Sequence, residues 1–176
     1  LEADVPARQA RPPPMKTAVI VTTYNRPQAL RLVLNSLANQ SVPADQVVVA
    51  DDGSTQSTAE CVAGFQAKMP LQHAWQADQG FRAAAARNLA VSRSDADYLI
   101  FLDGDCIVPP DFIEKHQRLA EAGWFVAGNR ILLAQRLTHD VIERQADIAS
   151  WSTWRWLWQS CLGECNRWMP RLFMPG

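Results

Sequence analysis

Four short apolar runs recur along the chain and predict four β-strands. They cover residues 17–23, 46–50, 71–77 and 98–102. The first run, TAVIVTT, is rich in β-branched residues, and the last, YLIFL, is apolar throughout. Runs of this length and composition are typical of strands that are buried in a sheet.

Between these runs the apolar residues follow a helical spacing. Starting at Leu30, they recur at i, i+3, i+4 and i+7, which predicts one buried helix face. Asn25 is the expected N-cap of this helix, and Pro27 lies close to its first helical position. Further helices are expected over residues 57–69, 81–93 and 111–123, the last of them closed by a glycine.

Strands and helices therefore alternate along the chain. This order predicts an α/β fold with a mainly parallel central sheet and helices on both of its faces. In such a sheet, ligands bind beyond the carboxyl ends of the strands. Polar residues follow three of these strands: TTYN at 22–25, DDGS at 51–54 and DGD at 103–105. We therefore expect the three polar clusters to share one edge of the sheet.

The composition is that of a globular protein, and it argues against two kinds of partner. The 176 residues are 48% hydrophobic and 20% charged with a formal net charge of −1, so nothing favours attraction to nucleic acid. No apolar run approaches the roughly 20 residues of a membrane span. Residues 1–14 are polar and proline-rich, as in a linker or a remnant of an expression tag. Four scattered cysteines without a CxxC pair favour reduced thiols in a cytoplasmic protein over a zinc site.

The two carboxylates after the fourth strand are the clearest chemical signal. Asp103 and Asp105 flank Gly104, and glycine lets the backbone approach a ligand closely. Carboxylates at this spacing can both reach one Mg²⁺ or Mn²⁺, which completes its coordination with water and phosphate oxygens. Arg82 and Arg87, near a predicted helix N-terminus, can pair with a diphosphate or with the acids. The alternative is a solvated acidic turn beside ordinary surface arginines.

Four ordered segments carry a resemblance to a known family. They read AVIVTTYNRP, VVVADDGS, DQGFRAAAARN and YLIFLDGDCIVPPDF. In order and spacing, over about residues 16–130, they resemble the inverting glycosyltransferases of family 2, which have the Rossmann-like GT-A fold. The third segment is similar to the subgroup of chondroitin polymerase-like and lipopolysaccharide-type hexosyltransferases. The resemblance implies a nucleotide-sugar donor, with UDP favoured, a saccharide or lipid-linked saccharide acceptor, and Mn²⁺ or Mg²⁺.

The resemblance also implies which residues bind the nucleoside. Thr22 and Tyr24 would line its pocket, with the Tyr24 ring against the uracil, and Asn25 would lie beside them. Asp52 would accept a hydrogen bond from the base, and Asp51 would support Asp52.

A second group of residues is implied for the diphosphate and the sugar. Asp105 would bind the metal ion, and Asp103 would approach the ribose and the sugar and share the metal site. Arg87 and Asn88 match the Arg-Asn pair that lies near the nucleotide in the family. Arg82 would lie at the same helix entrance.

The catalytic base does not match the family. In the family it belongs to an acidic motif well downstream of the metal-binding acids, and no such motif precedes Gly176. We therefore expect residues 15–134 to bind the nucleotide sugar and residues 135–176 to begin an incomplete acceptor region. RLFMPG, at 171–176, has the pattern of a strand that continues. The base is expected beyond Gly176, and this truncated chain can lack activity on its own.

Two alternative functions fit parts of the pattern. A nucleotide-binding fragment without activity fits the missing base. The segment LIFLDGDCIV fits the start of a haloacid-dehalogenase-like phosphatase, in which two acids share a strand end. That class also needs a downstream acidic pair, and none follows Asp105.

Tryptophans are concentrated near the C-terminus. Trp151, Trp154 and Trp158 are expected on one helical stripe, with Trp156 pointing elsewhere. The favoured interpretation is that this helix packs on a further part of the protein. The alternative is a surface for the acceptor or for peripheral association with the inner face of the cell membrane, because tryptophan favours interfaces.

Overall fold

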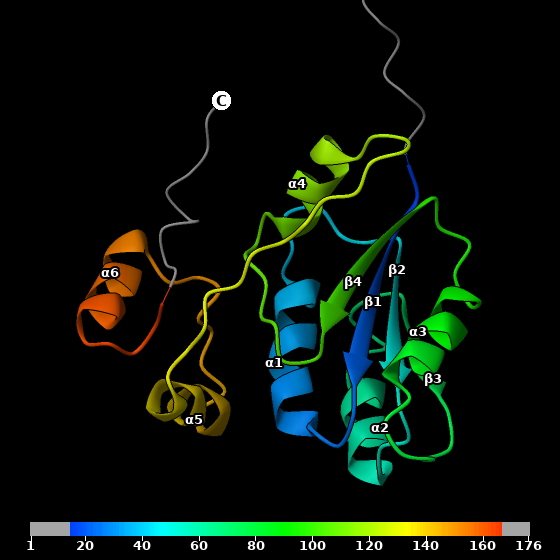
Figure 1. Cartoon of the computed structure of the whole chain (residues 1–176), viewed down its shortest axis with the longest axis horizontal. Helices are drawn as coiled ribbons and strands as arrows, with labels where there is room; N and C mark the ends of the chain where they lie inside the picture. The colour runs from blue at the N-terminus through cyan, green and yellow to red at the C-terminus, as the bar shows by residue number, and fades with distance from the viewer. Residues whose placement is uncertain (1–14, 167–176) are drawn as a thin grey trace, which may run out of the picture.

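A four-stranded parallel sheet forms the centre of the protein (Figure 1). The computed structural model describes residues 15–166. Its strands lie in the order β3-β2-β1-β4, so β4 is at one edge and β2 is enclosed by β1 and β3. The predicted strands are confirmed to within two residues; they are β1 (Thr17–Thr23), β2 (Gln46–Asp51), β3 (Leu71–Trp75) and β4 (Tyr98–Asp103).

Large aliphatic side chains cover one face of the sheet. Three helices pack there: α1 (Pro27–Ala38), α2 (Gln56–Ala63) and α4 (Phe112–Leu119). Each fully buried valine or leucine contributes about 1.5–3 kcal/mol, so this face is the main hydrophobic core. Its fully buried side chains include Val19, Val21, Leu30, Val33, Leu34, Val47, Val49 and Ile113.

Small side chains cover the other face. Ala86 and Ala90 of α3 (Ala83–Val91) pack on the sheet at a cluster formed by Ile20, Val48 and two alanines of β2 and β3. Because alanine projects so little from the backbone, α3 lies close against the strands. Figure 1 shows α1 and α3 on opposite sides of the sheet, which confirms the predicted α/β class with helices on both faces.

Several predicted helix boundaries differ from those in the structure, and two of the differences have a local cause. The N-cap of α1 is Arg26 and not Asn25, because Asn25 adopts a left-handed backbone conformation (φ 48°) and belongs to the preceding turn. Pro27 is confirmed as the first helical residue. The helix expected over 57–69 ends at Ala63, and α4 ends at Leu119 because Ala120 is extended (ψ 123°).

The last two helices attach to the outer side of α1. Leu32 of α1 packs in a cluster with Leu137 and Val141 of α5 (Gln135–Glu143) and with Trp156 of α6 (Thr153–Cys161). An antiparallel bridge between Leu133 and Cys165 closes this part of the chain. The predicted division after residue 134 stays a prediction.

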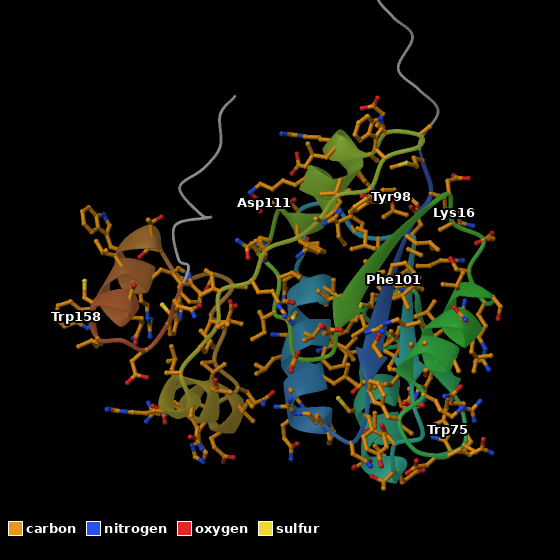
Figure 2. The ribbon with its side chains drawn as sticks, viewed as in Figure 1. Lys16, Trp75, Tyr98, Phe101, Asp111 and Trp158 are labelled. Atoms are coloured by element: carbon orange, nitrogen blue, oxygen red, sulfur yellow. The ribbon has the colours of Figure 1, made fainter. Side chains whose placement is uncertain are left out.

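The predicted tryptophan stripe is partly wrong. Trp151 precedes α6, and its ring lies 5.3 Å from the ring of the buried Trp156. Trp154 and Trp158 are exposed on α6, and Figure 2 shows Trp158 at the outer limit of the molecule. No helix within residues 15–166 is long and apolar enough to cross a bilayer. The strand expected at 171–176 lies outside the described residues.

Candidate functional site

The carboxyl ends of the strands bring the three polar clusters together, as the sequence predicted. In the parallel register, Thr22 lies opposite Asp103, and Thr23 lies opposite Asp51. Asp51 in turn lies opposite Trp75 at the end of β3. Residues from four strands therefore form one row along this edge.

Asp51 is a buried structural acid. Its side chain lies within hydrogen-bond reach of two groups: the Ser54 N–H donates to Oδ1 at 2.8 Å, and His73 Nε2 lies 2.8 Å from Oδ2. Burial by itself would raise the pKa of Asp51, but the hydrogen bonds from His73 and Ser54 outweigh it and hold the pKa below its usual value. Asp51 is 0% exposed, so it supports the loop after β2 from within.

Asp52 fastens the loop between β3 and α3 to the end of β2. Its Oδ1 accepts from Gln76 Nε2 at 2.6 Å, and its Oδ2 accepts from the backbone N–H of Arg82 at 2.7 Å. Gly53 permits this close packing, because a Cβ there would lie 2.5 Å from the Cα of Asp78. Its positive φ of 96° also suits glycine.

Tyr24 and Asn25 join the loop after β1 to the neighbouring loops. The Asn25 N–H donates to Ser54 Oγ at 2.8 Å, and its side-chain oxygen accepts from the Thr55 N–H at 2.9 Å. The Tyr24 hydroxyl donates to Asp78 Oδ2 at 2.9 Å, a contact that raises the pKa of Tyr24. Tyr24 is 49% exposed, so its ring offers a flat aromatic surface at the edge of the sheet.

Asp103 lies between two guanidinium groups. Arg87 donates from Nε to Thr22 Oγ1 at 2.8 Å and from Nη2 to Asp103 Oδ1 at 3.1 Å. On the other carboxylate oxygen, Arg130 Nη1 lies 3.5 Å from Oδ2. Arg87 thus connects α3 to the ends of both β1 and β4.

Asp105 lies beside Asp103, and the two residues form the acidic cluster of the site. Arg26 Nη1 donates to Asp105 Oδ2 at 3.1 Å, and the Cys106 thiol lies 3.8 Å from Oδ1. Burial and the Asp105 charge raise the pKa of Cys106, so the thiol stays protonated. Gly104 allows the tight turn, because a Cβ there would lie 2.7 Å from the carbonyl oxygen of Thr22.

The acidic cluster fits a divalent cation. Ligand atoms of Asp103, Asp105 and Cys106 all lie within 4.8 Å of one another. Mg²⁺ and Mn²⁺ prefer oxygen ligands, so the two half-exposed carboxylates suit them better than the protonated thiol does.

Two of the residues predicted for the site are placed differently from the rest. On α3, the residues Ala83, Ala86 and Ala90 face the sheet, and at 100° per residue Asn88 falls on the opposite, exposed side. Arg82 contacts Asp52 through its backbone N–H, while its guanidinium donates to Gln79 Oε1. The structure therefore does not bring the Asn88 side chain to the acidic cluster.

Arg26 and Arg130 lie in the site but were missed from the sequence. Arg26 follows β1 by three residues, so its position beyond a strand end was a usable signal. Arg130 is far from any strand end in the sequence, and it reaches the site because the chain after α4 runs back beside β4 and α1 (Figure 1). No local pattern predicts that return.

Comparison with known proteins places the chain in a family. The model of glycosyl transferase family 2 matches residues 18–160. The chain belongs to this family. The recognition of the family from the four ordered segments is therefore confirmed, and the phosphatase alternative is set aside.

Relatives of named activity match a little over half of the chain. The validoxylamine A glucosyltransferase of Streptomyces hygroscopicus subsp. limoneus is 36% identical over 100 residues, which are 56% of this chain and 22% of the relative. The chondroitin synthase of Escherichia coli is 32% identical over 103 residues, which are 58% of this chain and 15% of the relative. The chain thus spans less than a quarter of either relative.

A solved structure confirms the predicted GT-A fold. The crystal structure of residues 1–349 of TarS from S. aureus, in complex with UDP-GlcNAc, matches with a TM-score of 0.51 and 30% identity. The match covers 57% of this chain and 30% of that chain.

Proposed function

We propose that this chain is the nucleotide-sugar-binding part of a glycosyltransferase that transfers a sugar from UDP to a saccharide or lipid-linked saccharide acceptor. The observation that carries the proposal is the Asp103–Asp105 pair at the carboxyl edge of a family 2 domain, with Arg87 held between Asp103 and Thr22. Two similar proteins are a glucosyltransferase and a chondroitin synthase, and the TarS structure holds UDP-GlcNAc.

The nucleoside would bind between the loops after β1 and β2. The exposed ring of Tyr24 suits stacking against a uracil, and Thr22 lies on the same strand end. Each oxygen of Asp52 already accepts one hydrogen bond, which leaves a second lone pair on each for the base. Asp51 and Asn25 would act indirectly, by holding these loops in place.

The diphosphate would bind at the acidic cluster. Asp103 and Asp105 would hold Mn²⁺ or Mg²⁺, and a bound cation would stabilise the negative charge that develops on the leaving diphosphate. Arg87, fixed by Thr22, would present its guanidinium to the same charge.

Inverting transfer also needs a carboxylate base that deprotonates the acceptor hydroxyl. Asp51 and Asp52 are buried, and Asp103 and Asp105 face the proposed diphosphate position. None of these four acids suits the task, so we assign the base to none of them. Peripheral membrane association through the exposed Trp154 and Trp158, and a cytoplasmic location, stay predictions.

Calorimetric titration of the chain with UDP tests the proposal. We expect binding in the presence of Mn²⁺ and loss of most of that binding after EDTA, because the carboxylates and the diphosphate share the cation. GDP is the matched nucleotide, and we expect it to bind more weakly than UDP. Equal affinity for UDP and GDP would contradict the proposed contacts with uracil. No binding by a folded sample would overturn the proposal for this chain.

A further inference from the structure

Three guanidinium groups surround two carboxylates at the carboxyl edge of the sheet. Arg87 and Arg130 contact opposite oxygens of Asp103, and Arg26 contacts Asp105. The cluster therefore carries one more positive charge than negative. An excess of positive charge around a pair of acids disfavours a cation that binds alone and favours an anionic ligand.

The three arginines are not equally fixed. Arg87 is 38% exposed and held by a second hydrogen bond to Thr22. Arg26 and Arg130 are 56% and 64% exposed, and each pairs with an aspartate that is itself half exposed. Exposed ion pairs of this kind contribute about 0–1 kcal/mol, so Arg26 and Arg130 can leave their partners at little cost.

We infer that Arg26 and Arg130 bind the diphosphate of the donor, and that without the donor they occupy the carboxylate oxygens that the cation needs. Arg26 contacts Oδ2 of Asp105, and Arg130 contacts Oδ2 of Asp103. The guanidinium group pairs with phosphate oxygens in a planar, bidentate geometry, and a diphosphate carries more negative charge than one carboxylate, so it offers both arginines a better partner. The inference rests on the proposed function and adds two residues to the donor site.

A coupling between cation and nucleotide follows from this exchange. A cation alone has to displace two guanidinium groups and raises the positive charge of the cluster further. A cation that arrives with a diphosphate brings compensating negative charge and releases the arginines to new partners. Each ligand therefore increases the affinity for the other, as linkage requires.

The test uses Arg26→Gln and Arg130→Gln, both at exposed side chains whose loss leaves the hydrophobic core intact. Binding of Mn²⁺ alone is measured by electron paramagnetic resonance of the free ion, and binding of UDP at saturating Mn²⁺ by calorimetry. We expect each variant to bind Mn²⁺ alone about threefold more tightly, because a competing positive charge is gone. We expect UDP with Mn²⁺ to bind about tenfold more weakly, because a charge-assisted hydrogen-bond donor is lost.

Two controls separate the proposed exchange of partners, in which Arg26 and Arg130 leave the aspartates for the diphosphate, from general effects of charge. Arg118→Gln removes a comparably exposed arginine from α4, which Figure 1 shows near the amino ends of the strands, and it should change neither affinity. Uridine lacks the diphosphate, and its affinity should be the same in all variants.

The outcomes distinguish this inference from the proposed function. If the wild-type chain binds UDP with Mn²⁺ and both arginine variants match it, only the inference is overturned. If the variants weaken Mn²⁺ and UDP binding together, the arginines support the acids and do not compete for them, which also overturns it. If the folded wild-type chain binds no UDP, the proposed function fails and the inference fails with it.

Discussion

The protein has two pairs of acids at the same edge of one sheet, and the two pairs differ in every other respect. Asp51 and Asp52, at the end of β2, are 0% and 4% exposed. Asp51 accepts a hydrogen bond from Ser54 of the following loop, and Asp52 accepts hydrogen bonds from Gln76 and Arg82 of the loop between β3 and α3. Asp103 and Asp105, after β4, are about half exposed and pair with arginine side chains from other elements.

The position of each strand in the sheet explains the difference. β2 is enclosed by β1 and β3, so the loops that follow its neighbours cover the acids at its end. β4 is an edge strand, and the acids at its end have open space on one side. The first pair therefore mainly builds the shape of the site, with Asp52 limited to the proposed hydrogen bond to the base, and the second pair is the more accessible to a ligand.

The largest expected effect is on stability, at the buried pair. Asp51→Ala removes the acceptor from the Ser54 N–H and from His73, and we expect a loss of about 3 kcal/mol in the free energy of unfolding. Asp103→Ala, the matched change at the exposed pair, should cost less than about 1 kcal/mol. Urea unfolding of both variants measures the difference, and equal losses would contradict the division into a structural pair and a ligand-facing pair.

The next effect is on binding, at the exposed pair. Asp105→Asn keeps the size of the side chain and removes a charged ligand of the cation, so we expect UDP binding in Mn²⁺ to weaken by about tenfold or more. Thermal stability should hardly change. Asp111→Asn alters an acid that pairs with Lys115 and is the control. Unchanged UDP affinity in Asp105→Asn would contradict the assignment of Asp105 as a ligand of the cation.

The smallest effect is on the pH dependence of stability. Because the folded protein holds the pKa of Asp51 below its usual value, the ionised side chain stabilises the fold above about pH 4, and this contribution is lost as the pH falls through the folded-state pKa. We expect the stability gap between the wild type and Asp51→Asn to be full at pH 6 and to shrink below pH 4. A gap that is the same at pH 6 and pH 3 would contradict the lowered pKa.

Local patterns predicted the sheet and the position of the site well. The apolar runs marked all four strands. β1 and β2 are buried on both faces and so need apolar residues at successive positions, while β3 and β4, at the edges of the sheet, include exposed residues such as Trp75 and Phe101. The parallel order then placed Thr22, Asp51 and Asp103 along one edge without further information. The contact of Arg87 with Asp103 was one of two partners considered for that arginine.

Contacts between segments far apart in the sequence were not predictable in the same way. Asparagine is a favoured N-cap residue, but the side chain of Asn25 accepts a hydrogen bond from Thr55, in the loop after β2, instead of capping α1. Trp151 shares the helical spacing of Trp154, yet it packs on Trp156 outside the helix. Arg130 reaches Asp103 only through the path of the chain after α4. For Asn25 and Arg130, a partner distant in sequence decides the position; for Trp151 the partner is near in sequence but lies within the helix that Trp151 precedes.

The alanine surface beneath α3 has a consequence for how this domain can change. Alanine has no side-chain torsions, so Ala86 and Ala90 cannot adopt another rotamer to absorb an altered neighbour. A larger residue at either position must lift the helix, and Arg87, on the same turn, would move away from Thr22 and Asp103 with it. On the α1 face, by contrast, aliphatic residues can exchange with modest repacking. Sequence variation in this domain should therefore be least restricted on the α1 face, where the side chains are large, and most restricted on the α3 face, where they are smallest.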